Sequence, residues 1–176
     1  MSFVNYYSCS RTYDVDLSAP PRERWEEAAE KFGDKIHKLH QHVDEVADDF
    51  CDTSWWRTLR LLRRGILDPL SMMVRWFGQD YAYEIKGISR TVGLPYGELV
   101  AMNLLYDISQ GCCSGACSSA SFVTKRQRPV LARNMDWPCP DSIGEHTVIC
   151  RMHKNGSFYT SVGVAGFVGV LSAQRN

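Results

Sequence analysis

The spacing of apolar residues changes once along this chain, near residue 112, and this change limits the folds that it can adopt. Before the change, apolar residues such as Ile36 and Leu39 recur at three- and four-residue steps, which places them on one face of a helix. After it, short runs of β-branched and aromatic residues are separated by turn residues, which is typical of strands. We therefore expect an α+β chain, with a helical leader over residues 1–116 followed by an antiparallel β-sheet over residues 117–176.

Helix ends in the leader are marked by proline and glycine. Pro20 precedes a helical segment that Gly33 closes, and Asp34 begins a second one. Further along, Gly93 ends one helix and Pro95 begins the next. This punctuation predicts roughly four to six helices in the leader.

A tight turn is predicted in the strand-rich part of the chain. Asn155 and Gly156 separate two runs in which apolar and polar residues alternate. The Asn-Gly pair readily adopts the positive backbone angles that a two-residue hairpin turn requires. We therefore expect a β-hairpin at this position.

Chain length and charge narrow the classes of protein to consider. With 176 residues, the sequence suits one structural domain. Its 20 Lys and Arg residues balance 20 Asp and Glu residues, so the chain has no net basic charge to favour nucleic acid. The first residues lack the basic start and apolar core of a secretory signal, and no apolar stretch has membrane-spanning length. The chain is therefore either cytoplasmic or has had a signal removed, which leaves its compartment open.

Seven cysteines, an odd number, indicate at least one free thiol. Three of them, Cys112, Cys113 and Cys117, lie within one short segment, unlike the dispersed cysteines of a disulfide framework. Histidines such as His146 and His153 could add zinc ligands, but no two cysteines have C-x-x-C spacing and adjacent cysteines rarely bind one metal. We expect neither a metal nor a cofactor.

The segment around Cys117 has the residues of a cysteine nucleophile. Small residues flank Cys117 on both sides, which suits a cleavable bond between Ala116 and Cys117. Arg133 and Asp136 follow, and two strands joined by a turn would bring them back beside the cysteine. A guanidinium lowers the pKa of a neighbouring thiol. An α-amine freed by cleavage has a pKa of about 8 and can act as a base near neutrality, with Asp136 to orient it.

A second interpretation of the same residues involves no chemistry. Cys117 would be one buried thiol among seven, and Arg133 and Asp136 would form an ion pair on the surface of a strand. Residue spacing alone leaves both interpretations open.

Residues 117–137 resemble the nucleophile segment of the acid ceramidase and N-acylethanolamine-hydrolysing acid amidase family. In that family, Cys and then Thr or Ser are followed at this spacing by Arg, Asn, a hydrophobic residue and Asp. Residues 13–27, 84–107 and 161–173 are similar to the start of the family's first helix, to its helices before the nucleophile and to its Gly-rich strand pair. The likeness covers nearly the whole chain. It extends more distantly to bile salt hydrolases and penicillin V acylases, the choloylglycine hydrolase-like enzymes.

The resemblance implies the αββα sandwich of N-terminal-nucleophile (Ntn) hydrolases and a role for each matching residue. Cys117 is similar to the family's nucleophile and self-cleavage site, Arg133 to its substrate-polarising arginine, and Asp136 to the partner of the freed amine. The implied enzyme hydrolyses linear carbon–nitrogen amide bonds of lipid amides through a thioester. Ceramide, cleaved to sphingosine and fatty acid, is the first expected substrate; N-acylethanolamine or a bile-salt or penicillin-type amide is the alternative. Members of the family are often lysosomal or secreted.

The resemblance covers only the N-terminal half of the family's length. Family members continue well past the position of Asn176, and their later segment supplies an oxyanion-hole asparagine, a glutamate used in self-processing and a further arginine. We therefore expect the C-terminal part of the fold to be absent, and exposed sheet edges would favour self-association. The competing interpretation is a truncated, inactive homologue that acts as a membrane-surface or interaction module.

Residues 53–77 combine tryptophans and arginines with aliphatic residues. On helices, the apolar and aromatic residues would share one face and the arginines another. Such a cationic amphipathic element can lie in a lipid headgroup layer and would place a lipid amidase against its substrate. Its apolar face could equally pack against the missing half of the enzyme, with the arginines solvated. The residues expected at this membrane or hydrophobic interface are Trp55, Trp56, Leu59, Leu62, Trp76 and Phe77.

Overall fold

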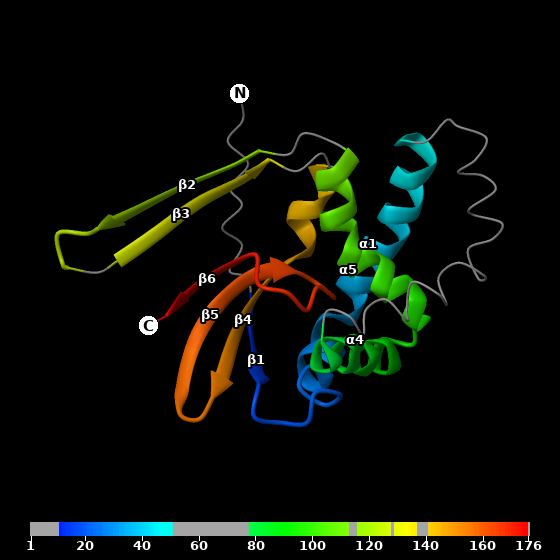
Figure 1. Ribbon diagram of the computed structural model, residues 1–176, viewed down its shortest axis with the longest axis horizontal. Coiled ribbons are helices and arrows are strands. Elements are labelled where there is room, and N and C mark those ends of the chain that lie inside the picture. Colours follow the sequence, from blue (N-terminus) through cyan, green and yellow to red (C-terminus); the bar gives the residue numbers. More distant parts are fainter. Residues whose placement is uncertain (1–10, 51–77, 113–115, 128, 137–140, 176) are drawn as a thin grey trace.

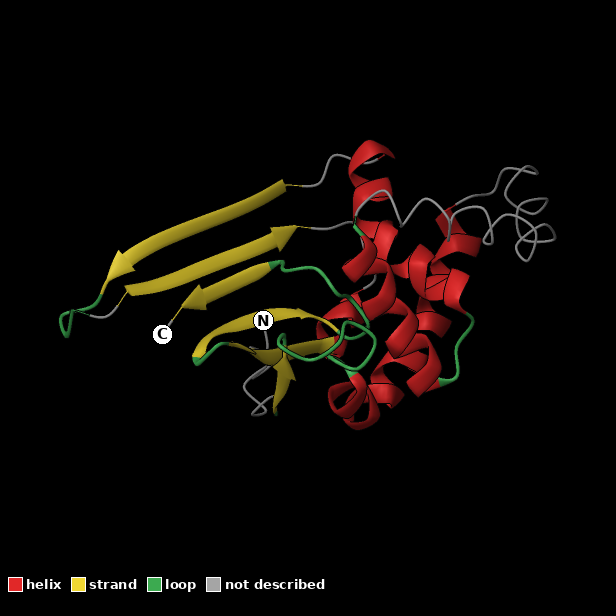
Figure 2. Cartoon of the chain, turned by 60° about the horizontal axis from the view of Figure 1, so that its bottom comes forward, coloured by secondary structure: helices red, strands yellow, loops and turns green. Residues whose placement is uncertain are grey.

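The chain folds into a group of helices beside a group of strands (Figures 1 and 2). The computed structural model describes residues 11–50, 78–112, 116–127, 129–136 and 141–175. An α+β chain with antiparallel strands is confirmed. The elements in chain order are β1 (Thr12–Asp16), α1 (Glu26–Phe50), α4 (Gln79–Val92), α5 (Tyr96–Cys112), β2 (Ala116–Val123), β3 (Pro129–Asp136), the 3-10 helix η2 (Asp141–His146), β4 (Thr147–Lys154), β5 (Ser157–Val164) and β6 (Ser172–Arg175).

The strands form a four-stranded sheet in the order β1-β4-β5-β6 and a separate two-stranded ribbon of β2 and β3. The pairs β4–β5, β5–β6 and β2–β3 are antiparallel, but β1 is parallel to β4, with Val15 opposite Met152. Strand structure therefore begins before the helices and not only after Cys117, which corrects the expected order. Tyr13 and Val15 are the buried positions of an alternating run, but five residues are too few to distinguish a strand from a loop by pattern.

The predicted hairpin at Asn155 and Gly156 is confirmed. Both residues have positive φ, 50° and 77°, and they connect β4 to β5. Two successive positive φ angles give a turn whose twist matches that of the flanking strands.

Helix ends in the leader agree with the sequence at one junction and differ at another. Gly93 ends α4 with φ of 73° and donates its backbone N–H to the Ser89 carbonyl, and α5 begins directly after Pro95. The expected break at Gly33 is instead a kink inside α1, where Phe32 has φ of −117° and ψ of 17°. Within the described part of the leader, the α-helices are α1, α4 and α5. None of the helices in that part combines the length and apolar character needed to cross a membrane.

One hydrophobic core joins the helices to the four-stranded sheet. The helices lie against this sheet, whereas the ribbon projects away from them (Figure 1). No described residue of the ribbon belongs to the core. Large or central members of the core are Val15, Phe32, Ile36, Ile85, Ile88, Leu99, Val100, Val148 and Met152.

A buried ionic cluster ties the segment before α1 to α4. Arg24 Nη1 lies 2.5 Å from Glu84 Oε1, and the Trp25 indole N–H donates to Glu84 Oε2 at 2.7 Å. Close packing of the two segments requires Gly87, because a Cβ there would lie 2.1 Å from the Arg22 carbonyl oxygen. The cluster therefore fixes the orientation of α4 relative to the start of α1.

Candidate active site

The β2–β3 ribbon carries the three residues that the sequence predicts to be catalytic. Its strands are joined by a turn in which the Gln127 N–H donates to the Thr124 carbonyl. The predicted hairpin is therefore confirmed as a backbone arrangement, and it brings Arg133 and Asp136 back alongside the start of β2. The register pairs Ala116 with Asp136, Cys117 with Met135 and Ser119 with Arg133.

The register also divides these positions between the two faces of the ribbon. Alternate positions of a strand share a face, so Cys117 and Ser119 occupy positions on the same face. Arg133 lies directly opposite Ser119 and therefore occupies a position on that face too. Cys117 and Arg133 are thus diagonal neighbours, a separation that long side chains can bridge. Asp136 occupies a position on the other face, opposite Ala116 and beside the peptide bond expected to be cleaved. The roles of Ala116, Cys117, Arg133 and Asp136 stay predictions.

Arg133 connects the ribbon to β6. Its Nη1 donates to the Leu171 carbonyl and, at 3.2 Å, to the Ser172 hydroxyl. A second link lies nearer the turn, where Gln174 Nε2 donates to the Pro129 carbonyl at 2.9 Å. Figure 2 shows β6, which ends at the C label, running alongside β3. The sequence does not reveal Leu171 as a partner of Arg133, because a backbone carbonyl leaves no residue signature.

The ribbon is exposed to solvent. Every described side chain of its two strands except Val130 is exposed, and the exposed fraction reaches 51% for Phe122, 63% for Val123 and 42% for Leu131. A two-stranded ribbon in water is marginally stable by itself. The exposed apolar residues therefore mark a surface that another polypeptide could cover.

Cys150 differs from the candidate nucleophile in its surroundings. It lies on β4 in the hydrophobic core, and burial raises the pKa of its thiol to about 12. A thiol with that pKa is protonated near neutrality and is a poor nucleophile. Cys150 is therefore a core residue.

Two histidines far apart in sequence meet where α1 contacts η2. His42 Nδ1 of α1 lies 3.1 Å from His146 Nε2, while His146 Nδ1 is buried and has no hydrogen-bond partner among the described residues. Burial, followed by the charge of His42, holds the pKa of His146 below its ordinary value of 6.5. The sequence gives no sign of this pair, because its members are 104 residues apart.

The lowered pKa of His146 makes stability depend on pH. As pH falls through 6.5, the unfolded chain binds a proton at this residue before the folded chain does, so unfolding becomes more favourable. We expect the melting temperature to fall between pH 7.5 and pH 5.5, and to fall less in the variant His146→Gln, which does not titrate. Thermal unfolding followed by circular dichroism across this range tests the expectation. Equal slopes for the two proteins would exclude His146 as the cause.

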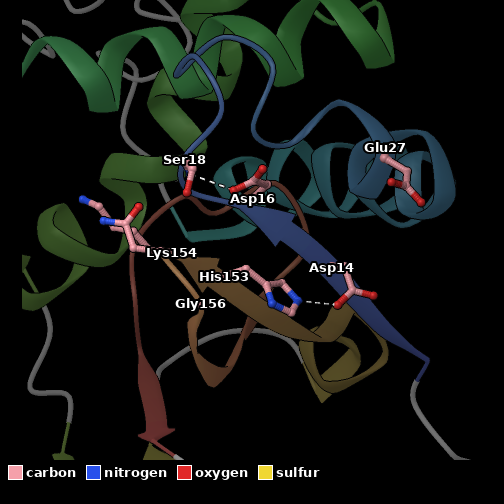
Figure 3. A pocket seen from close by; sticks show the side chains of 8 residues that line it. Asp14, Asp16, Ser18, Glu27, His153, Lys154 and Gly156 are labelled. Atoms are coloured by element: carbon pink, nitrogen blue, oxygen red, sulfur yellow. Dashed lines mark hydrogen bonds and ion pairs between the residues drawn. The ribbon is translucent and has the colours of Figure 1, made fainter.

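A pocket of about 360 Å³ lies between β1 and the β4–β5 turn of the four-stranded sheet (Figure 3). His153 Nε2 lies 2.7 Å from Asp14 Oδ1, and the Ser18 N–H donates to Asp16 Oδ1 at 2.8 Å. The hydrogen bond with His153 is the main reason why the pKa of Asp14 lies below its ordinary value. Among the described residues that line this pocket, none is a predicted catalytic residue. The predicted interface residues Trp55, Trp56, Leu59, Leu62, Trp76 and Phe77 lie outside the described residues.

Comparisons with known proteins point to one family. The family model for the beta subunit of N-acylethanolamine-hydrolyzing acid amidase matches residues 11–64. The chain is 25% identical over 174 residues to N-acylethanolamine-hydrolyzing acid amidase of Caenorhabditis elegans, and the match covers 94% of this chain and 45% of the relative. It is also 25% identical over 178 residues to the probable acid ceramidase of that organism, with 93% of this chain and 42% of the relative covered.

More distant relatives and a solved structure carry the same names. Acid ceramidase of Mus musculus is 20% identical over 176 residues, covering 91% of this chain and 41% of the relative. A solved structure of the Caenorhabditis elegans N-acylethanolamine-hydrolyzing acid amidase ortholog is similar with a TM-score of 0.43 and 26% identity, covering 58% of this chain and 90% of that one. The chain spans less than half the length of these curated relatives. Because the named relatives match it almost from end to end, the chain is similar over nearly its whole length to acid ceramidases and N-acylethanolamine-hydrolyzing acid amidases.

Proposed function

We propose that the complete enzyme is an Ntn cysteine amidase that hydrolyses the linear amide bond of a lipid amide, with Cys117 as its nucleophile. The observation that carries this proposal is the register of the ribbon, in which Cys117 is the second residue of β2 and the position of Arg133 lies diagonally across from it. An arginine there favours the thiolate and can bind the substrate carbonyl oxygen. The names of the relatives support ceramide and N-acylethanolamine as substrates.

The enzyme first cleaves its own chain. The Cys117 sulfur attacks the carbonyl carbon of Ala116, and the acyl group moves from the backbone nitrogen to the sulfur. Water then hydrolyses the resulting thioester, which frees the carboxylate of Ala116 and the α-amine of Cys117. In this proposal Asp136, whose strand position lies opposite Ala116, orients that amine. The chain would then divide into a leader of residues 1–116 and a second subunit that begins at Cys117.

Substrate hydrolysis repeats the same chemistry. The α-amine accepts the thiol proton, and the sulfur attacks the amide carbonyl while Arg133 stabilises the charge that develops on its oxygen. The carbon–nitrogen bond breaks, the amine product leaves with a proton, and a thioester remains on Cys117. Water attacks this thioester, releases the fatty acid and restores the thiol.

Mass spectrometry and a substrate panel test the proposal. We expect a species that begins at Cys117, selective labelling of that residue by a thiol reagent, and release of fatty acid from ceramide or an N-acylethanolamine. Bile-acid conjugates and penicillin V serve as alternative substrates in the panel, and a preference for either would overturn the lipid assignment. An intact chain without turnover in the complete enzyme would favour the second candidate function, an inactive interaction module, which the exposed ribbon also fits.

Exposure of the ribbon predicts self-association of this chain when it is alone. Among the described strands, β2 pairs only with β3, so its other edge is free to pair with a second copy. We expect dimers or larger species in light scattering after size-exclusion chromatography, and mostly monomers for the double variant Val123→Lys and Leu131→Lys. Tyr83→Lys, at an exposed aromatic residue of α4, is the matched control and leaves the association unchanged. A monomeric wild-type chain at all concentrations would contradict the prediction.

A further inference from the structure

Helix α5 leads to the candidate active site along two routes. Its last residue, Cys112, lies shortly before β2 begins at Ala116, so the helix leads into the strand that holds Cys117. The second route starts in the middle of the helix, at Asn103, and passes through the loop between β5 and β6. This loop is the connection that ends at β6 in Figure 1.

Asn103 is buried and uses both ends of its amide on that loop. Only 2% of the residue is exposed. Its Nδ2 donates to the Gly166 carbonyl at 2.9 Å, and its Oδ1 accepts the Val168 N–H at 2.9 Å. Nδ2 also donates to the Leu99 carbonyl within α5, at 2.9 Å. Holding both loop groups takes a side chain with a donor and an acceptor, and the amide of Asn103 supplies both.

The same loop ends on Arg133. Three residues after Val168, the Leu171 carbonyl accepts a hydrogen bond from Arg133 Nη1, and the next residue, Ser172, accepts another at 3.2 Å. The loop is also anchored at its start, where the Ala165 N–H donates to the His146 carbonyl. The loop from Ala165 to Ser172, which contacts both Asn103 and Arg133, is therefore short and anchored at each end.

We propose that Asn103 is a positioning residue: by fixing the β5–β6 loop, it holds the Arg133 guanidinium at its place on the face of the ribbon that carries Cys117. This inference rests on the proposed function, in which Arg133 favours the Cys117 thiolate. Without Asn103, the Gly166 carbonyl and Val168 N–H lose their buried partners and the loop shifts to recover them. Small displacements of a supporting group are enough to weaken a catalytic arrangement. Helix α5 then positions two residues of the site. Cys117 follows its C-terminal end, and Arg133 is held through Asn103 in its middle.

The reactivity of Cys117 measures the position of Arg133 directly. In the 176-residue chain, the rate of alkylation of Cys117 by iodoacetamide is followed by peptide mass spectrometry from pH 6 to pH 9.5. The other charged residue near this end of β3 is Asp136, which stays unchanged throughout. We expect a midpoint below the ordinary thiol pKa of about 8.5 in the wild type and a return towards it in Arg133→Gln. Asn103→Leu raises the midpoint by roughly half a unit, which lowers the rate at pH 7 about threefold.

Three further variants keep the test decisive. Val100→Ala lies on the same helix and removes buried apolar atoms but no hydrogen-bonding group, so it lowers stability, keeps the hydrogen bonds of Asn103 to the loop and leaves the midpoint unchanged. If Asn103→Leu does not melt cooperatively, Asn103→Asp and Ser172→Ala, which weaken the same link from its two ends, take its place. A wild-type midpoint in folded variants of this link, together with a shifted one in Arg133→Gln, overturns the role of Asn103 and leaves the proposed function standing. An unshifted midpoint in Arg133→Gln counts against the proposed function itself.

Discussion

Replacing Cys117 with alanine is expected to lower the amidase rate of the complete enzyme by several powers of ten and to abolish the species that begins at residue 117. Both results have one cause, because the same sulfur forms the acyl intermediate in self-cleavage and in substrate hydrolysis. Losses of this size are typical when the nucleophile of a covalent mechanism is removed. Fatty-acid release and intact-protein mass spectrometry measure the two effects on the same sample.

Cys150→Ala is the matched control for this variant. Cys150 is also a cysteine on a strand, but it is buried in the core and its pKa of about 12 keeps the thiol protonated. Its replacement should lower stability slightly and leave self-cleavage and turnover in place. Persistence of either activity in Cys117→Ala, or its loss in a folded Cys150→Ala protein, would show that the nucleophile lies elsewhere.

Glu84→Ala is expected to lower the free energy of unfolding by about 3 kcal/mol or more, because it leaves buried polar groups without partners. Glu84 is 7% exposed and accepts hydrogen bonds from the Arg24 guanidinium and from the Trp25 indole. Removal of the carboxylate leaves the Arg24 guanidinium largely shielded from water, where it still contacts the Ala19 carbonyl and the exposed Asp80 carboxylate among the described residues. Urea denaturation of the chain measures the loss.

A surface ion pair within α1 provides the comparison. Glu27 contacts Lys31 one helical turn later, and both side chains are mostly exposed. Exposed pairs of this kind contribute little, so Glu27→Ala should leave the denaturation midpoint nearly unchanged. Glu84→Gln, which keeps an acceptor for the indole but loses the charge, should fall between the other two variants. Similar midpoints for Glu84→Ala and Glu27→Ala would show that the buried cluster does not stabilise the fold.

Several parts of the fold could be predicted from the sequence because adjacent residues encode them. The Asn155-Gly156 turn, the helix end at Gly93 and the helix start after Pro95 depend on backbone preferences that act over a few residues. The kink at Phe32 is not predicted from the sequence, because a glycine such as Gly33 weakens a helix without forcing the helix to end. Local signals therefore predict turns and helix ends more reliably than they predict whether a helix continues past a glycine.

The candidate site, like the fold, could be predicted from the sequence only in part. Small residues around Cys117, and the turn that returns the chain to Arg133 and Asp136, are visible in the sequence, and β2 and β3 form this hairpin. The support behind Arg133 is not visible, because it consists of the Leu171 carbonyl and a loop held by Asn103, 63 residues away from Gly166. A backbone acceptor can belong to any residue type, so no motif marks it.

By itself, the sequence determined the α+β class and the two hairpins, one of which carries Cys117, Arg133 and Asp136, because these follow from short-range periodicity and turn chemistry. Tertiary structure alone decided that β1 pairs in parallel with β4, that Arg24 meets Glu84, and that His42 meets His146. Each of these contacts joins residues that are distant along the chain. Their pairing depends on how the whole chain closes around its core, which no local pattern specifies.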